Sequence, residues 1–528
     1  MAESEPPSRY PPSEDDKEVK EALEVGAVNT VEDASQTGTF ADEDNPFFVQ
    51  NLVYSKEEEA KVIRILDTRL FPWILLTTFV LNMDRTNNSN AISDNLPEDL
   101  GFTINGVNTA TAIYSVLFSI ACLSGAVIAK MAGPARWIPV LMFSWGLVTL
   151  AHALISDNSG YIAVRSFIAL TEGGVIPATL VYLGGFYKST ELATRLAWFW
   201  GVQNIASAVS GLMASGLLQL RGVGGLFGWK WLFIVDGIIT LFVAVLTWFY
   251  LPRNAARTKG GIRGFKPWFD ERQVLIAVTR VVRDDPAKKR YDSTVTWTDV
   301  KDSITDIGLW GHWAQASIGL TPTTPLGTYL PTVIKSFNFN VFVANALTAP
   351  PYILTCISSV AVIWHSDYAR ERGFHGAFSA GWQLVGWILL RSLPDGTSRG
   401  VKYFAACVVQ SWPYSHPLNI AWMSENTGSV GKRTIASGAV IGFANIYGVW
   451  ASQIYQASDS PNFKRGNIVN IAFAGTATIL WLLQKTYYKR RNAQNARAWA
   501  AMSDAERERE EQEAEKKGNR SVTFKFTT

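Results

Sequence analysis

About twelve apolar stretches run through this chain, and each is long enough to cross the hydrocarbon core of a bilayer as a helix. One crossing takes about 20 helical residues, because the core is about 30 Å thick. Inside lipid every backbone N–H and C=O group needs a partner within its own segment, so a helix is the expected form. We therefore predict an all-α membrane protein with about twelve transmembrane helices, arranged as two bundles of about six. The stretches are 71–92, 108–130, 137–155, 160–183, 196–219 and 230–250, and after a polar gap 307–333, 342–364, 376–393, 402–423, 434–455 and 467–486.

Charge is concentrated in the segments outside these stretches. Of the 528 residues, 48% are hydrophobic and 18% are charged, which is too apolar for an ordinary soluble protein of this length. The net charge of +3 sums an acidic tail and basic loops that are expected to act separately, so it does not indicate a nucleic-acid partner. The predicted parts are a disordered acidic tail (1–66), a first bundle (67–251), a basic loop (252–303), a second bundle (304–488) and a charged, solvated tail (489–528).

Lysine and arginine in the short loops predict the orientation, because these residues prefer the cytoplasmic side of a membrane. The first outer loop then carries Asp94, Glu98 and Asp99 and no basic residue. We expect both termini to be cytoplasmic. With the N-terminus inside, the cytoplasmic loops hold Lys130, Arg136, Lys188, Arg195, Lys432 and Arg433.

Two of the apolar stretches each carry a pair of charged residues: Asp84 and Arg85 in the first, and Arg165 and Glu172 in the fourth. A charge near the bilayer centre costs about 2.5–3.5 kcal/mol even on a lenient scale, so it tends to serve a transport pathway. Consecutive helical positions point about 100° apart, which prevents Asp84 from pairing with Arg85. Arg165 and Glu172 are nearly two turns apart and share one helix face. We expect Asp84 to pair with Arg165, and Arg85 with Glu172.

These pairs suggest how an anion and a proton would be coupled. Arg85 presents a permanently charged planar fork, so it is the expected ligand of an anionic substrate. A substrate carboxylate would compete with Glu172 for Arg85, and the released Glu172 would take up a proton because an unpaired charge is unfavourable in apolar surroundings. Asp84 would be coupled in the same way through Arg165. The alternative is a fixed structural clamp, and it applies most to Arg165.

Polar and aromatic residues in other stretches are expected to complete a pocket near the membrane midplane, where transporter helices are often interrupted. Pro322 and Pro413 lie among the prolines that would interrupt two of the stretches. Each polar residue alternatively makes only a hydrogen bond between helices. No motif suggests a metal site, and no cofactor is expected beyond a proton gradient. The substrate-binding candidates are Tyr114, Gln203, His312, Asn419, Trp422 and Asn445.

A series of short motifs lies at the ends of the expected helices. Together they resemble the anion:cation symporter branch of the major facilitator superfamily, and specifically the fungal allantoate permease family, from about residue 67 to residue 489. The motifs are LNMDRTN at 81–87, GPARW at 133–137, EGG at 172–174, FYK at 186–188, GWKWLF at 228–233, YLPT at 329–332, PPY at 350–352 and NTG at 426–428.

The resemblance implies proton-coupled uptake of a small organic anion, such as a vitamin carboxylate or an allantoate-like ureide. It implies the same roles for Arg85 and for the acids Asp84 and Glu172. The expected partners are therefore the anion, protons and the lipid bilayer, with the protein a monomer in the plasma membrane.

Gating residues follow from the same resemblance. The superfamily normally has an aspartate in the loop between the second and third helices, and here that loop keeps Arg136 without the aspartate. The corresponding loop of the second half keeps Asp367, followed by Arg372. We expect Arg136, Asp367 and Arg372 to act at the gate.

Other functions remain open. The same pocket would serve export of an anionic metabolite, and the long tails leave room for a nutrient sensor that does not transport. A proton-driven drug exporter fits less well, because the stretch 196–219 lacks the expected Gly-Pro pair. No P-loop, Gly-x-Ser-x-Gly or HExxH motif occurs, so an enzyme is not expected.

Overall fold

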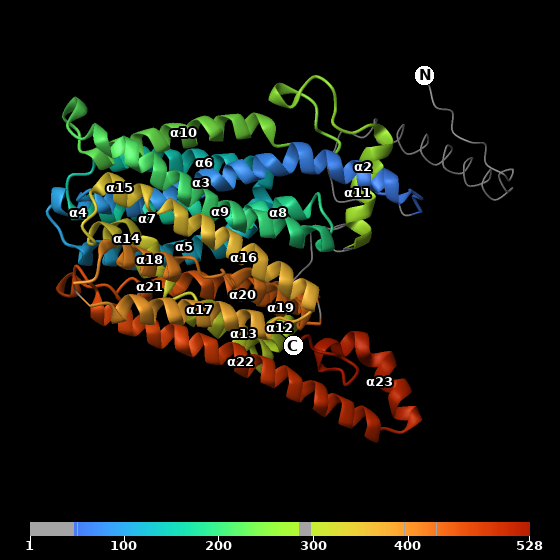
Figure 1. The fold of residues 1–528 in the computed structure, drawn as a ribbon. Coiled ribbons are helices and arrows are strands. Elements are labelled where there is room, and N and C mark those ends of the chain that lie inside the picture. Colours follow the sequence, from blue (N-terminus) through green and yellow to red (C-terminus); the bar gives the residue numbers. More distant parts are fainter. Residues whose placement is uncertain (1–46, 50, 285–296, 395, 429) are drawn as a thin grey trace, which may run out of the picture. The chain divides into compact units, whose positions relative to one another are not determined.

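The chain is helical throughout the residues that the structure describes. These residues, in a computed structural model, are 47–49, 51–284, 297–394, 396–428 and 430–528. No strand occurs among them, and Figure 1 shows the helices following one another along the chain. The predicted all-α fold is therefore confirmed for these ranges.

Seven helices in the described residues are long and apolar enough to cross a membrane, by length and composition. The predicted number of about twelve crossings and the orientation of the termini stay predictions. The seven cover Lys56–Ser93, Ile104–Ala129, Pro134–Leu154, Asn158–Gly184, Gly228–Tyr250, Val341–Ala369 and Lys464–Ala501, and a shorter apolar helix covers Ile435–Ala451.

Helices of the first half follow the expected stretches. The stretch 160–183 is divided near Gly174, where another helix comes very close. A Cβ atom added at Gly125 would lie 2.5 Å from the Cα atom of Gly174, so this contact requires glycine. The helices are α3 (Phe71–Ser93), α4 (Leu96–Asp99), α5 (Ile104–Ala132), α6 (Pro134–Ala151), α7 (Asn158–Glu172), α8 (Val175–Gly184), α9 (Ser189–Leu217) and α10 (Gly228–Tyr250).

Helices of the second half are more interrupted. The stretches 307–333 and 402–423 are each divided in two, next to Pro322 and Pro413, because proline lacks an N–H group and clashes with the preceding turn. Figure 1 shows α17 and α22 side by side. The helices are α13 (Ile307–Ile318), α14 (Thr323–Lys335), α15 (Val341–Ala346), α16 (Ala349–Ala369), α17 (Gly373–Ser392), α18 (Arg399–Gln410), α19 (His416–Glu425), α20 (Val430–Ile446), α21 (Gly448–Ala451) and α22 (Lys464–Ala501).

The chain divides into two compact units. Of the described residues, the first unit holds those within 47–72, 182–192 and 249–284, and the second holds those within 73–181, 193–248 and 297–528. The first unit contains α2 (Lys56–Ile65) and α11 (Glu271–Asp284), and the second contains α12 (Trp297–Ile304) and α23 (Asp504–Lys517).

Helix α2 corrects the expectation that residues 1–66 are disordered. Ser55 and Glu58 form a capping box at its start, in which each side chain binds the backbone N–H of the other. Residues 1–46 of the expected tail lie outside the described residues.

The acidic face of α2 pairs with basic residues of the same unit. Arg272 Nε on α11 donates to Glu58 Oε1 over 2.6 Å. Arg280 on α11 is fully buried and donates to Glu191 Oε1 over 2.6 Å, with Glu59 at 3.6 Å. The acidic segment and the basic loop therefore neutralise each other here, although the sequence suggested that they act separately.

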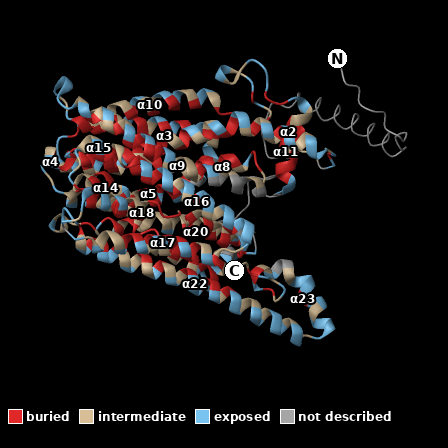
Figure 2. Cartoon of the chain, in the orientation of Figure 1, coloured by how far each residue is buried: buried red, intermediate tan, exposed pale blue. Residues whose placement is uncertain are grey.

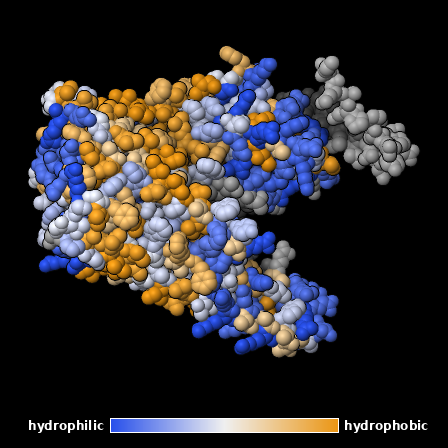
Figure 3. All heavy atoms as spheres, in the orientation of Figure 1, coloured by the Kyte–Doolittle hydropathy of each residue, from blue (hydrophilic) through white to orange (hydrophobic). Residues whose placement is uncertain are grey.

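Large apolar side chains are exposed along the outside of the long helices in the second unit. On α10, Ile238, Phe242 and Trp248 are half exposed or more. Figure 2 shows buried and exposed residues alternating along such helices, and Figure 3 shows hydrophobic side chains gathered over α10. A soluble protein would bury this surface, whereas lipid accommodates it.

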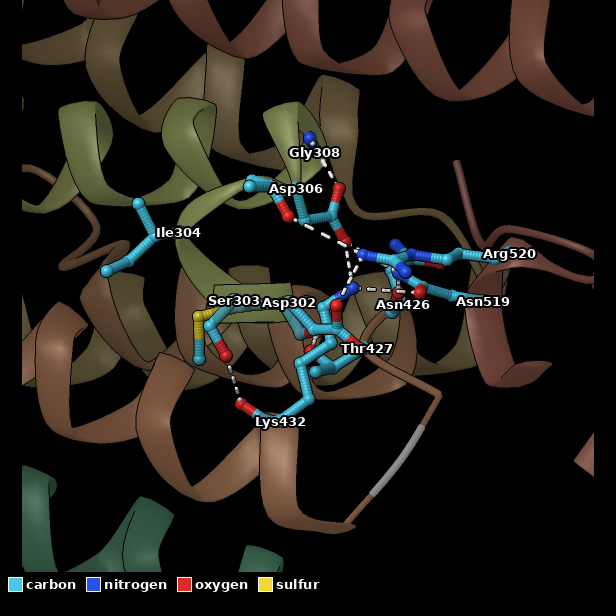
Figure 4. A network of polar contacts seen from close by, with 12 residues as sticks. Asp302, Ser303, Ile304, Asp306, Gly308, Asn426, Thr427, Lys432, Asn519 and Arg520 are labelled. Carbon is cyan, nitrogen blue, oxygen red and sulfur yellow. Dashed lines mark hydrogen bonds and ion pairs between the residues drawn. The ribbon is translucent and has the colours of Figure 1, made fainter. Parts of the chain in front are cut away.

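The last eleven residues, 518–528, fold back onto helix ends of the second unit. Asn519 Nδ2 donates to Asp306 Oδ2 over 2.9 Å, and Lys432 Nζ donates to Asn519 Oδ1 over 2.9 Å (Figure 4). Arg520 Nη2 donates to Asp302 Oδ1 over 2.8 Å. This part of the charged tail is therefore docked on the protein, in contrast to the solvated tail expected for 489–528.

Candidate functional site

A cavity of about 180 Å³ lies in the second unit, between helices from both halves of the sequence. This volume suits a small solute, since a water molecule takes up about 30 Å³ in the liquid. Helices α3 and α7 supply the charged groups of its wall, α5 supplies hydroxyl and aromatic groups, and α14, α20 and the turn after α20 supply neutral polar groups. The wall includes Arg85, Tyr114, Arg165, Thr324, Asn445 and Tyr447.

Arg85 on α3 and Glu172 at the end of α7 form the expected ion pair. Arg85 Nε donates to Glu172 Oε2 over 3.0 Å, and Tyr114 OH donates to the same oxygen over 3.0 Å. The Glu172 side chain is 1% exposed, and its Oε1 atom has no hydrogen-bond partner in the part of the chain that the structure describes. Both donors also line the cavity, so a solute there would compete for them directly.

Arg165 on α7 is a second guanidinium in the wall of the cavity. Its Cζ atom lies 4.7 Å from the centroid of the Tyr114 ring, a position at which a cation is attracted to the π face. Among the described residues it has no ion pair and no hydrogen bond from its side chain. Contrary to the expectation, Arg165 and Asp84 form no ion pair at contact distance among these residues, although the Arg165 charge still attracts Asp84. The Arg165 guanidinium lines the cavity.

Asp84 on α3 is bound by other elements. Thr149 Oγ1 on α6 donates to Asp84 Oδ2 over 2.7 Å, and the carboxyl groups of Asp84 and of Asp236 on α10 lie within hydrogen-bond reach of each other. Asn87 Nδ2 on α3 donates to Asp236 Oδ2 over 2.7 Å. Asp84 therefore belongs to a buried acidic pair behind the cavity wall.

Asp236 is a candidate site residue that the sequence reasoning missed. It is fully buried, and it is the one acidic residue of the stretch 230–250. The same rule that marked Asp84, the high cost of a charge inside a membrane helix, applies to it.

Of the remaining substrate-binding candidates, Asn445 lines the cavity. Its Nδ2 atom donates to Ile441 O of the same helix over 2.7 Å, which leaves its Oδ1 atom to face a solute. Gln203 on α9 is half-buried and does not belong to the cavity wall.

His312, Asn419 and Trp422 lie together elsewhere in the second half. His312 Nδ1 and Asn419 Oδ1 are 2.7 Å apart, and His312 Nε2 is 2.9 Å from Tyr488 OH. Trp422 Nε1 donates to Thr527 O, in the docked C-terminal segment, over 2.8 Å. This cluster joins helices to the C-terminal segment and does not line the cavity.

The structure brings together two of the three gating candidates. Arg372, at the start of α17, is bound to Asp367 and also donates to Glu425 Oε1 over 2.6 Å. The sequence reasoning did not identify Glu425 as a partner of the gating candidates. Arg136, in the first turn of α6, is exposed.

No group of three or more His, Cys, Asp or Glu residues that could hold a metal ion occurs within the described ranges. The chemistry available at the cavity is therefore that of guanidinium, carboxyl, phenol, hydroxyl and amide groups.

Comparison with known proteins relates this geometry to a family. Residues 74–452 match the Major Facilitator Superfamily. An uncharacterized transporter of Saccharomyces cerevisiae is 29% identical over 482 residues, which cover 91% of this chain and 89% of that protein. The MFS-type transporter cnsO of Penicillium expansum is 29% identical over 512 residues, which cover 95% of this chain and 96% of that protein.

Solved structures share the fold at low identity. A bacterial homolog of the human lysosomal transporter Spinster, inward-facing and unoccupied, has a TM-score of 0.60 at 12% identity and covers 82% of this chain and 98% of its own. A D-xylose-proton symporter has a TM-score of 0.58 at 13% identity and covers 78% of this chain and 96% of its own. These two likenesses concern the fold alone.

Proposed function

The chain belongs to the Major Facilitator Superfamily and is a multi-pass membrane transporter of a small molecule, and we propose that it takes up a small organic anion together with protons. The observation that carries this proposal is the cavity wall. It presents two guanidinium groups, and among the described residues only one of them is paired with a carboxylate.

A carboxylate is the natural complement of this wall. Arg85 and Arg165 carry two positive charges against the single negative charge of Glu172, so one positive charge is in excess. A guanidinium binds a carboxylate through two parallel N–H groups, and such charge-assisted bonds are about twice as strong as neutral ones. The amide of Asn445 and the hydroxyl of Thr324, from the second half of the chain, add neutral polar groups to the wall.

Proton coupling follows from the competition at Glu172. A carboxylate bound by Arg85 and Arg165 displaces Glu172 from the Arg85 Nε atom. The displaced carboxyl is buried and keeps only Tyr114 as a donor, so its neutral form becomes favourable. One proton then enters with one anion, and the charge of the site is unchanged.

The membrane topology that we propose rests on the sequence. We propose about twelve crossings, with both termini and the basic loop 252–303 in the cytoplasm. The resemblance to the allantoate permease family supports uptake of a small organic anion, and we propose that the protein acts as a monomer in the plasma membrane. Asp367, Arg372 and Arg136 are the proposed gating residues.

Uptake measurements test the proposal. The chain is expressed in yeast cells that lack their own carboxylate carriers, and a panel of labelled small carboxylates is offered beside the matching methyl esters, with and without an uncoupler. We expect accumulation of at least one acid, no saturable uptake of its ester, and loss of accumulation with the uncoupler. Accumulation that survives the uncoupler contradicts proton coupling, and competition by neutral compounds alone contradicts anion binding.

A further inference from the structure

Buried charges in the first-half helices do not balance if every group is ionised. The acids are Asp84, Glu172 and Asp236, and the guanidinium groups are Arg85 and Arg165. Three carboxylates would face two cations, which leaves one negative charge in excess inside a membrane helix bundle. Such a charge is strongly unfavourable in that setting. One of the three acids therefore holds a proton when the cavity is empty.

The contacts indicate which acids share this proton. The Arg85 guanidinium donates to Glu172 over 3.0 Å, so Glu172 is neutralised by a cation. Asp84 and Asp236 have no cation within ion-pair distance among the described residues. Their carboxyl groups lie close enough to hydrogen bond to each other. Asn87, one turn after Asp84 on α3, donates to Asp236 Oδ2, which places Asp236 beside the α3 face that carries Asp84. Two ionised carboxylates offer only acceptors, so a bond between them requires a proton.

The remaining polar contacts of the pair come from neutral donors. Thr149 Oγ1 donates to Asp84 Oδ2 and Asn87 Nδ2 donates to Asp236 Oδ2, each over 2.7 Å. Asp236 Oδ1 has no hydrogen-bond partner from a donor side chain in the described residues. These neutral donors can stabilise one negative charge on the pair. The pair therefore holds one proton and one negative charge, shared between its two carboxyl groups.

Several other titratable groups lie on the elements around the pair. Arg85 on α3 is engaged by Glu172, and Arg165 on α7 faces the cavity and the Tyr114 ring. His152, just after α6, is fully buried, stacks on Phe233 with ring centroids 4.2 Å apart, and has its Nδ1 atom 3.3 Å from Val148 O. Tyr161 OH on α7 donates to Asn88 Oδ1 over 2.9 Å. The Arg165 charge attracts Asp84 without touching it, and none of these groups supplies a cation in contact with the pair.

We propose that Asp84 and Asp236 form an acid pair that holds one shared proton, and that this pair is a protonation site separate from Glu172. The role of this pair in transport rests on the proposed proton-coupled uptake. The presence of the shared proton does not depend on that function. When the pair loses its proton, the second negative charge would attract Arg165 away from the cavity. Protonation of the pair thereby makes the Arg165 fork available to the anion.

Infrared spectroscopy of the purified protein tests the proton directly, without substrate or transport. A protonated carboxyl group has a carbonyl-stretch band that ionised carboxylates lack. We expect this band at neutral pH, and we expect it to shift when the protein is labelled with ¹³C-aspartate but not with ¹³C-glutamate. No band, or a band that shifts only with glutamate labelling, overturns the proposal, and this measurement needs no substituted protein.

Substitutions then assign the band to the pair. Asp84→Asn and Asp236→Asn are each expected to abolish it, because an amide can donate to the remaining carboxylate without a shared proton. Glu172→Gln and the matched control Asp306→Asn, which changes an aspartate bound to Lys432, are expected to keep it. A band that persists in Asp236→Asn, or disappears in Asp306→Asn, overturns the assignment. Failure of anion uptake with the band intact would instead count against the proposed function alone.

Discussion

Arg85 Nε lies 3.0 Å from Glu172 Oε2, and this ion pair joins α3 to the end of α7 at the wall of the central cavity. The pair is the contact that an anionic solute must disturb, because Arg85 lines the cavity and Glu172 is buried behind it. Tyr114 is a second donor to the same oxygen, which keeps Glu172 in place when Arg85 moves.

Glu172→Gln separates binding from proton coupling. The amide occupies the same volume and still accepts from Arg85 and Tyr114, but it cannot take up a proton. We expect exchange of labelled for unlabelled substrate to continue across the membrane, while accumulation driven by a pH gradient is lost. The measurement compares counterflow with pH-driven uptake in proteoliposomes. Gradient-driven accumulation in this variant would show that another group carries the coupled proton.

Arg165→Gln is expected to weaken anion binding. Truncating one partner of a buried charged contact costs about 2–5 kcal/mol, so the Kd should rise by about 30-fold or more. Arg165→Lys keeps the charge without the planar fork, so its Kd should lie between those of the unchanged protein and of Arg165→Gln. Arg497→Gln, an exposed arginine on α22, is the matched control and should bind normally. Unchanged affinity in Arg165→Gln would assign the anion to Arg85 alone.

Gly125→Ala tests the close contact between α5 and the segment after α7. An added Cβ atom would lie 2.5 Å from Gly174 Cα, and a backbone atom cannot move aside as a flexible side chain can. We expect a lower thermal transition in detergent, by several degrees. Gly216→Ala on α9 meets no atom within 4 Å and is the control, with a gain of up to about 1 kcal/mol from the better helix propensity. Equal transitions for the two variants would contradict the close packing.

Deletion of residues 518–528 should destabilise the second half. The segment supplies the hydrogen bonds of Asn519 and Thr527 and the stacking of Phe526 on Tyr488, with ring centroids 5.0 Å apart. Each buried hydrogen bond contributes about 1 kcal/mol, so we expect a drop of several degrees in the thermal transition. Glu511→Ala, an exposed residue on α23, should leave the transition unchanged. An unchanged transition in the deletion would mean that the docked segment adds no stability.

Asp306 should make this docking sensitive to acid. Burial acts to raise the pKa of Asp306, but the hydrogen bonds from Lys432 and Asn519 outweigh burial and leave the pKa below its ordinary value. The contribution of Asp306 to stability is therefore present above its unfolded-state pKa of about 3.9 and is lost as the pH falls through the folded-state pKa. Asp306→Asn should lower the thermal transition at pH 7, and its difference from the unchanged protein should shrink below about pH 4. A difference that is constant with pH would contradict this.

Much of the helix pattern could be predicted from local composition. The apolar stretches of the first half coincide with α3, α5, α6, α9 and α10, since a helix satisfies its own backbone wherever the sequence is long and apolar enough. The breaks at Pro322 and Pro413 were also expected, because proline acts on its own turn. The helix α2 was missed because a strongly acidic composition hid the capping signal at Ser55.

The partners of the buried charges were predicted only in part. Seven-residue spacing placed Arg165 and Glu172 on one face of a helix, and Arg85 does pair with Glu172. The position of Asp84 depended on α6 and α10, whose Thr149 and Asp236 reach it from sequence distances that no local pattern relates.

By itself, the sequence determined that this protein is helical and apolar, roughly where the apolar helices of the first half lie, and that Asp84, Arg165 and Glu172 had to be buried, because these properties depend on nearby residues and on the solvent. Only the tertiary structure decided which charges meet. It left Arg165 facing the cavity, brought Asp84 close to Asp236, gathered His312, Asn419 and Trp422 away from the cavity and docked the C-terminal segment on Asp306. The physical reason is that a buried charge or hydrogen-bond donor pairs with whichever complementary group the packing brings within about 3 Å, however far apart the two residues are along the chain.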